Sequence, residues 1–167
     1  GLSSSEVIRA QATRLLRDNR DRFTHSFGGQ WLDFREPAPG MLGPSMQQES
    51  HDVFAAVLES NLPADRLLRP GFTLLDGQLG RHYGLPLSGL GPTYRVTTTE
   101  RGGLLSQGGF LTRTANGSEF RRPIHRGIWV LQRLLCRPLP KLDPATLEEI
   151  GNSFNTIDRT LPLPEQM

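Results

Sequence analysis

The sequence predicts a mainly α protein of four to five helices, with a loop-rich second half and at most one small β element. Apolar residues recur at helical spacing through the first half of the chain. Glycine, proline and serine concentrate at residues 86–92, and a single stretch after them alternates as a short strand does. With 167 residues, 36% of them hydrophobic and 22% charged, the chain can bury a core without disulfides.

Two helices are expected at the start of the chain. Ser3 and Glu6 have capping-box spacing, and apolar positions follow from Val7 to Leu16. The second helix is expected from Arg20 to Phe34. Its aromatic residues recur at steps of four, four and three, which predicts a buried stripe of Phe23, Phe27, Trp31 and Phe34.

The next two helices are separated by proline. The third is expected over residues 45–59, and Pro63 follows its end. The fourth is expected from Thr73 to Tyr83, with Gly84 as its C-terminal cap.

The second half of the chain carries weaker signals. Residues 94–99 alternate and are rich in β-branched side chains, which favours a short strand. The stretch from Arg101 to Arg126 is interpreted mostly as loop, and Pro123 opens a last clear helix that ends near Leu135. The predicted division is a helical subdomain over 1–86, a loop-rich segment with a basic amphipathic helix over 87–142, and a C-terminal helix and tail over 143–167.

Several kinds of site are excluded or disfavoured. The single cysteine, Cys136, excludes an internal disulfide and a multi-thiolate metal site. The four histidines lie far apart, without metal-ligand spacing, so no metal site is predicted. There is no CxxCH for covalent haem attachment, no nucleotide-binding glycine loop, no signal peptide and no apolar run long enough to span a membrane. No nucleophile and base stand in a recognisable order, so whether the chain takes part in an enzyme stays open.

The arginines are unevenly placed. The chain has 18 arginines and one lysine, with a formal net charge of +2. Residues 113–137 hold six arginines and one acid, a balance of +5, while the rest of the chain has a balance of −3. On an α-helix, four residues of this region share one face, which we call the cationic stripe: Arg126, Trp129, Arg133 and Arg137.

The opposite face of that helix carries Ile124, Ile128, Leu131 and Leu135. We expect the helix to bury this apolar side and to present the cationic stripe. The stripe is either a solvated face or a docking surface for an acidic partner, a phosphate or the carboxylates of a neighbouring domain. Nucleic acid is not an expected partner, because one tryptophan is no stacking platform and the whole chain is nearly neutral.

Four segments resemble motifs of one bacterial family. Leu79–Pro86 resembles an L-x-x-HYG-[IL]-P element, and Arg101–Gln107 resembles RGGLLTQ. Thr112–Leu131 is similar to a T-x-T-(S/A)-NG…P-(I/V)-x-RG-x-WVL element, and Phe27–Leu32 to F-x-x-QWL. Together they resemble the paired bacterial domains of unknown function fifteen-ninety-two and fifteen-eighty-eight, found in planctomycete and myxobacterial multidomain proteins.

In that family the domains sit between c-type cytochrome modules of long exported proteins. The resemblance therefore implies a periplasmic or cell-surface module in an electron-transfer protein. It implies no cofactor within this chain and haem c in neighbouring segments of a full-length protein. The implied partners are other domains of the same polypeptide or a cytochrome. The chain departs from the family pattern at Arg133 and Arg137, which are not motif positions.

The matched polar residues form a predicted ligand set, consisting of Arg101, Ser106, Gln107, Thr112, Thr114, Asn116 and Arg126. The first hypothesis is a non-catalytic scaffold or docking module that uses the cationic stripe. The second is a substrate-binding domain of a haem-dependent redox enzyme that uses the polar stretch 101–126. Polyanion binding by the arginines ranks third.

Overall fold

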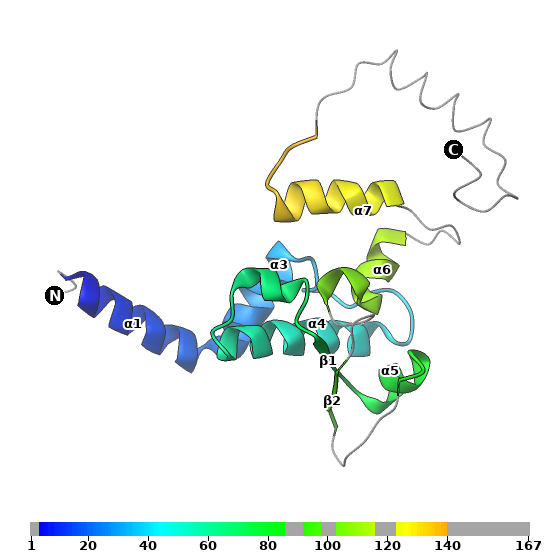
Figure 1. The fold of residues 1–167 in the computed structure, drawn as a ribbon, viewed down its shortest axis with the longest axis horizontal. Coiled ribbons are helices and arrows are strands. Elements are labelled where there is room, and N and C mark those ends of the chain that lie inside the picture. The colour runs from blue at the N-terminus through cyan, green and yellow to red at the C-terminus, as the bar shows by residue number, and fades with distance from the viewer. Residues whose placement is uncertain (1–3, 86–91, 98–102, 116–122, 140–167) are drawn as a thin grey trace, which may run out of the picture. The chain divides into compact units, whose positions relative to one another are not determined.

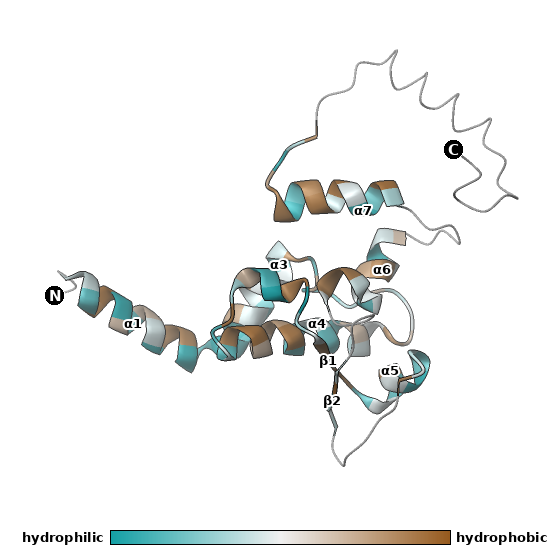
Figure 2. Cartoon of the chain, in the orientation of Figure 1, coloured by the Kyte–Doolittle hydropathy of each residue, from teal (hydrophilic) through white to brown (hydrophobic). Residues whose placement is uncertain are grey.

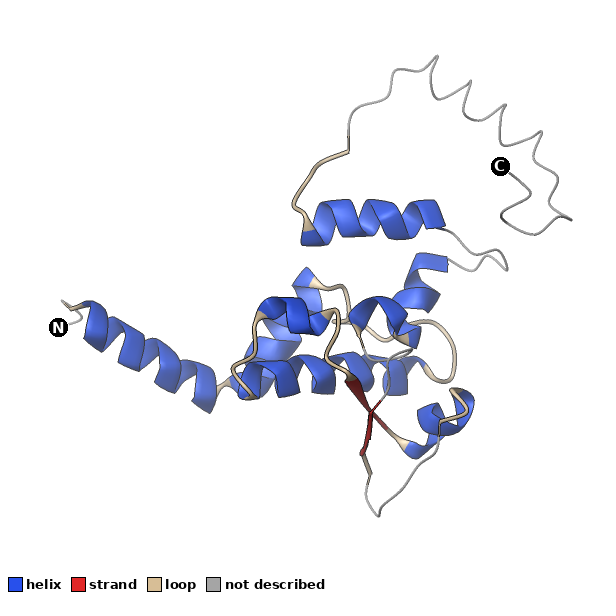
Figure 3. Ribbon diagram, viewed as in Figure 1, coloured by secondary structure: helices blue, strands red, loops and turns tan. Residues whose placement is uncertain are grey.

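The computed structural model describes residues 4–85, 92–97, 103–115 and 123–139. The chain divides into two compact units, Gly1–Trp129 and Val130–Met167. Within the described residues helices predominate, and two short strands pair as an antiparallel sheet (Figure 3). The mainly α fold class with one small β element is confirmed, whereas the division into 1–86, 87–142 and 143–167 remains a prediction.

The first helix, α1 (Ser5–Asp18), begins one residue later than the capping-box spacing predicts. Ser4, not Ser3, is the N-cap, and its hydroxyl accepts a hydrogen bond from the backbone N–H of Val7 at 3.3 Å. Asn19 ends the helix in a non-helical conformation. Its backbone N–H and its side-chain amide each donate to the carbonyl of Leu15 at 3.0 Å.

The helix expected from Arg20 to Phe34 is broken into three parts. They are α2 (Arg20–Phe23), a π-helical turn η1 (Thr24–Gly28) and α3 (Gly29–Trp31). The helix ends three residues earlier than predicted, because Asp33 takes a positive φ of 62° and the carbonyl of Gly29 accepts from the N–H groups of Phe34 and Arg35.

The aromatic residues of this segment are not the buried stripe that their spacing predicts. Phe34 is 2% exposed, but Phe27 is 49% exposed and stacks between Phe23 at 4.9 Å and Trp31 at 5.7 Å. Small residues face the core instead. A Cβ built on Gly28 would lie 3.1 Å from the ring of Phe54, so the backbone approaches the neighbouring helix too closely for a ring to fit between them.

Helix α4 (Gly43–Glu59) is the centre of the first unit (Figure 1). It contacts η1, the 3-10 turn η2 (Ala64–Leu67), the strand β1 (Phe72–Leu75), α5 (Gly77–His82) and α6 (Gly108–Ala115). The buried side of α4 consists of Gly43, Met46, Glu49, Ser50, Val53, Phe54 and Val57. The predicted third helix is confirmed, with a start two residues earlier and Pro44 in its first turn.

The prediction of one helix from Thr73 to Tyr83 is wrong in its first half. Strand β1 pairs antiparallel with β2 (Tyr94–Thr97), in a register that runs from Phe72 opposite Thr97 to Leu75 opposite Tyr94. Asp76 then starts α5, because its carboxylate accepts from the backbone N–H groups of Gln78 and Leu79 at 2.9 and 2.8 Å. Gly84 has a φ of +65°, which confirms its role as the cap of α5.

Part of the stretch interpreted as loop is helical. A 3-10 turn η3 (Leu104–Ser106) leads into α6 (Gly108–Ala115). Helix α7 (Pro123–Trp129) closes the first unit, and the π-helical turn η4 (Val130–Leu134) opens the second, so the expected extent of the last helix is confirmed. The predicted C-terminal helix and tail, 143–167, lie outside the described residues.

The expected orientation of α7 is wrong within the first unit. Trp129 packs edge-on against Phe110 of α6, with ring centroids 4.9 Å apart, while Ile124 is 54% exposed. Arg126 also points to α6, where its Nε donates to the hydroxyl of Thr114 at 3.3 Å. Helix α6 supplies these contacts and was not expected from the sequence, and no residue of α7 is fully buried, so the helical wheel of α7 alone could not identify its contacting face.

Candidate functional site

A buried carboxylate joins four elements of the first unit. Glu49 of α4 is 1% exposed. Its Oε1 accepts from the hydroxyl of Thr73 in β1 at 2.6 Å, and its Oε2 accepts from the hydroxyl of Tyr83 at 2.8 Å. The backbone N–H of Gly108 donates to that same Tyr83 oxygen at 2.8 Å. Hydrogen bonds to a buried carboxylate are strong, so this network fixes α4, β1, the end of α5 and the start of α6 together.

Gln107 is the most deeply buried member of the predicted ligand set. It is 0% exposed, and its Oε1 accepts from the hydroxyl of Ser50 on α4 at 2.8 Å. Its Nε2 has no hydrogen-bond partner among the described residues. Gln107 therefore connects the start of α6 to α4 from inside the core, and its role in binding a ligand remains a prediction.

The other described members of the set also contact protein groups. Thr114 donates to the carbonyl of Phe110 at 2.8 Å and accepts from Arg126. The hydroxyl of Ser106 donates to the carbonyl of Gly103 at 2.8 Å, and that of Thr112 lies 3.8 Å from the sulfur of Met46. Arg101 and Asn116 lie outside the described residues.

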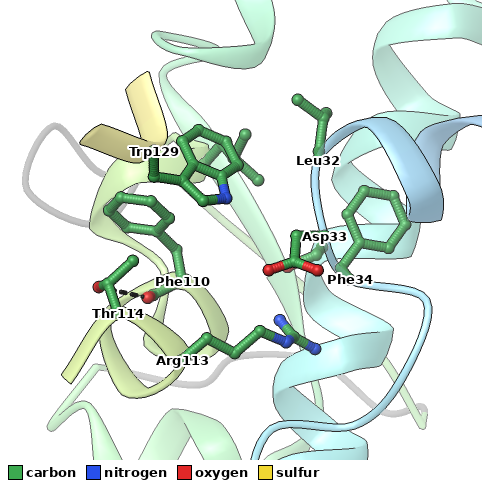
Figure 4. A pocket seen from close by; sticks show the side chains of 9 residues that line it. Leu32, Asp33, Phe34, Phe110, Arg113, Thr114 and Trp129 are labelled. Carbon is green, nitrogen blue, oxygen red and sulfur yellow. Dashed lines mark hydrogen bonds between the residues drawn. The ribbon is translucent and has the colours of Figure 1, made fainter. Parts of the chain in front are cut away.

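A small pocket lies between the segment that follows α3 and helices α4, α6 and α7 (Figure 4). Its space of about 10 Å³ is close to the minimum for one water molecule. Among the described members of the ligand set, Thr114 is the one that reaches it. The lining residues are Leu32, Asp33, Phe34, Ser50, Leu104, Phe110, Arg113, Thr114 and Trp129.

The pocket carries two charged groups that sequence reasoning did not single out. Arg113 extends from α6 toward the carboxylate of Asp33 and donates a hydrogen bond to the carbonyl of Glu36 (Figure 4). Burial lowers the pKa of the Arg113 guanidinium, and the charge of Asp33 acts in the opposite direction. Arginine stays protonated at neutral pH, so the two charges face each other across the pocket. In the sequence Arg113 is one of six neighbouring arginines, and nothing local separates it from the rest.

The cationic stripe is divided between the two units. Arg126 and Trp129 belong to the first unit and contact α6, whereas Arg133 and Arg137 belong to the second unit and are exposed. The docking role of the stripe remains a prediction. In the part of the chain that the structure describes, no three His, Cys, Asp or Glu side chains are grouped to hold a metal ion, and no helix is long and apolar enough to cross a membrane.

Two family models match the chain. A model described as PSD4, protein of unknown function (DUF1592), matches residues 1–85. A second, described as PSCyt3, protein of unknown function (DUF1588), matches residues 101–161. These are the two domains that the motifs resemble. Among curated proteins and among solved structures, no significant match was found.

Proposed function

Because 85 of its 167 residues match that model, the chain belongs to the PSD4 (DUF1592) family, and on this premise we propose that it is a non-catalytic scaffold or docking module. It works within an exported, cytochrome-c-associated multidomain protein, at the periplasmic side or the cell surface. It holds cytochrome modules of the same polypeptide in place for electron transfer. The neighbouring match to PSCyt3 (DUF1588) supports the multidomain setting.

The observation that carries the proposal is the use of the polar residues. Gln107, Thr114 and Ser106 bond to side chains or carbonyls of their own fold. A substrate-binding site would need such groups to converge on an open pocket. The pocket that Thr114 lines has room for about one water molecule, so these residues serve the packing of α6 and α7.

Hydrogen exchange tests the proposal. Backbone amide exchange is measured on this chain alone and on the full-length polypeptide that contains it. A docking module presents a surface that another domain covers, so a contiguous set of exposed amides should exchange at least about tenfold more slowly in the full-length polypeptide.

A matched pair of variants separates docking from internal stability. Thr114→Val removes a buried hydroxyl, while Thr13→Val removes an exposed hydroxyl on α1. Thr114→Val should speed exchange throughout the first unit without changing which surface the full-length polypeptide protects. If no amide differs between the chain alone and the full-length polypeptide, the docking function is wrong.

A further inference from the structure

The start of the chain forms an apolar groove that no described residue fills. The groove has a volume of about 490 Å³ and lies where α1 meets α2 and η1. Its lining residues are Ala12, Leu15, Leu16, Asn19, Arg22, Phe23 and Ser26. Helix α1 has no buried residue, and Leu15 is 52% exposed. In Figure 2 hydrophobic and hydrophilic segments alternate along α1, as in an amphipathic helix, and no described residue buries its apolar side.

The spacing of the lining residues indicates the shape of what would cover them. They recur every three or four positions from Ala12 to Ser26, which is the spacing of a helix face, and this face continues across the break between α1 and α2 at Asn19. Grooves with this repeat accept the side chains of a second helix, packed lengthwise. The small side chains at the two ends of the stripe allow close approach, and Leu15, Leu16 and Phe23 provide the apolar middle.

The charges around the groove indicate which charge a bound helix should carry. Among the described residues, Arg22 is the one charged side chain that lines the groove, and no described carboxylate does. Of the nearby acids, Asp18 already lies 3.5 Å from the guanidinium of Arg14, and Asp21 lies near His51, which is a cation only when protonated. Arg22 has no such partner among the described residues, so a carboxylate on an incoming helix would be attracted to it.

We propose that this groove binds an amphipathic helix whose apolar stripe is bordered by carboxylates, contributed by another domain of the same polypeptide. The proposal rests on the docking function above and assigns it a surface. Leu15, Leu16 and Phe23 provide the apolar contacts, and Arg22 selects for acidic borders and sets the register of the bound helix.

Two synthetic peptides test the groove directly. Each is a helix of about 18 residues, with leucine at heptad positions a and d. One carries glutamate at the flanking e and g positions and the other carries lysine there. Fluorescence anisotropy measures the binding of each peptide to this chain. The glutamate peptide should bind at least about tenfold more tightly than the lysine peptide.

Three variants identify the surface that binds. Leu15→Asp should weaken the binding of the glutamate peptide by about tenfold or more, because the substitution places a charge in the apolar middle of the groove. Arg22→Glu should reverse the preference between the two peptides. Arg17→Glu makes the same charge change on α1 at a residue outside the groove lining, and should leave both affinities within about twofold. All three residues are exposed, and circular dichroism checks that each variant remains helical.

The proposal is overturned if the two peptides bind equally, if neither binds, or if Leu15→Asp and Arg22→Glu behave like Arg17→Glu. The hydrogen-exchange comparison keeps this result separate from the docking function. Protection in the full-length polypeptide at a surface other than α1 and α2 would leave the docking function standing and remove the groove as its site.

Discussion

At the scale of single residues, Tyr83 shows how one hydroxyl can fix two elements. It donates to Glu49 and accepts from the N–H of Gly108, each at 2.8 Å. Removing the hydroxyl leaves a buried carboxylate oxygen and a backbone N–H each with one partner fewer. Buried groups that lose a hydrogen bond in this way are costly, typically by about 1–3 kcal/mol each.

We therefore expect Tyr83→Phe to lower the free energy of unfolding by about 2 kcal/mol, measured by urea denaturation. Tyr94→Phe is the matched control. It makes the same change in β2, where no hydrogen bond of the hydroxyl is found among the described residues, and should alter the free energy by less than about 0.5 kcal/mol. Equal effects of the two variants would show that the Glu49 network contributes nothing to stability.

A pair of glycines gives a second prediction at this scale. A Cβ on Gly108 would lie 2.6 Å from the hydroxyl oxygen of Tyr83 and 2.9 Å from Cε of Met46, whereas a Cβ on Gly127 in α7 would meet nothing within 4 Å. Gly108→Ala should destabilise the protein by about 1–3 kcal/mol through overpacking. Gly127→Ala should be neutral or stabilise it by up to about 1 kcal/mol through helix propensity. Thermal unfolding of both variants checks the sign, and a stabilised Gly108→Ala would contradict the packing described for α6.

At the scale of elements, α2 and α4 meet at a titratable group. His51 of α4 lies 3.4 Å from Asp52 and interacts with Asp21 of α2. The hydrogen bond with Asp52 raises the pKa of His51 above its ordinary value of 6.5, and the Asp21 charge acts in the same direction, while burial acts against both. A raised pKa in the folded state means that protonation of His51 stabilises the fold.

The stabilising effect is complete below the unfolded-state pKa of about 6.5 and is lost as the pH rises through the higher folded-state pKa. His51→Gln should therefore reduce the free energy of unfolding more at about pH 5.5 than at about pH 8.5. Urea denaturation at both pH values measures the difference. His82→Gln, at an exposed histidine of α5, is the control for loss of a histidine. A penalty for His51→Gln that is the same at both pH values would contradict the proposed role of the charge.

Elements that depend on local signals were predictable. The span of α4 and the cap at Gly84 follow from apolar spacing and from a residue that tolerates positive φ. The strand β1 was missed because Thr73 and its neighbours also fit a helical pattern. Pairing with β2, some 20 residues away in the chain, makes these residues a strand and not a helix.

The predicted ligand set stays a prediction, and the buried network around Glu49 was not predictable from the sequence. The sequence placed Gln107, Thr114 and Arg126 together in a stretch interpreted mostly as loop, and it gave no signal for Ser50 of α4, which bonds to Gln107 only through the tertiary fold. Helix α6 begins with two glycines, which are poor helix formers, so propensity argued against it. Close packing of Gly108 against Tyr83 and Met46 explains why glycine is needed there.

At the scale of the whole molecule, the arginine distribution makes a prediction about association. Replacing Arg126, Arg133 and Arg137 by glutamine takes the formal net charge from +2 to −1. If the cationic stripe docks onto carboxylates, this triple variant should reduce the exchange protection of residues 123–139 in the full-length polypeptide, and added salt should do the same to the wild type.

A control triple variant, Arg14→Gln with Arg66→Gln and Arg69→Gln, makes an identical change in net charge at exposed positions elsewhere. It should leave the protection of residues 123–139 unchanged. Should both triple variants act alike, net charge rather than the stripe would govern association.

The π-helical turn η1 also determines the direction in which α1 projects. Both Thr24 and Gly28 of this turn are buried, and a π turn holds one more residue than an α turn. Deleting exposed Ser26 would convert η1 to α-helical geometry. It would rotate the preceding chain, including α1, by roughly 100° about the helix axis. The azimuth of α1 is therefore set by a single extra residue, and homologous chains that lack it would offer the same apolar residues to a neighbour on another side.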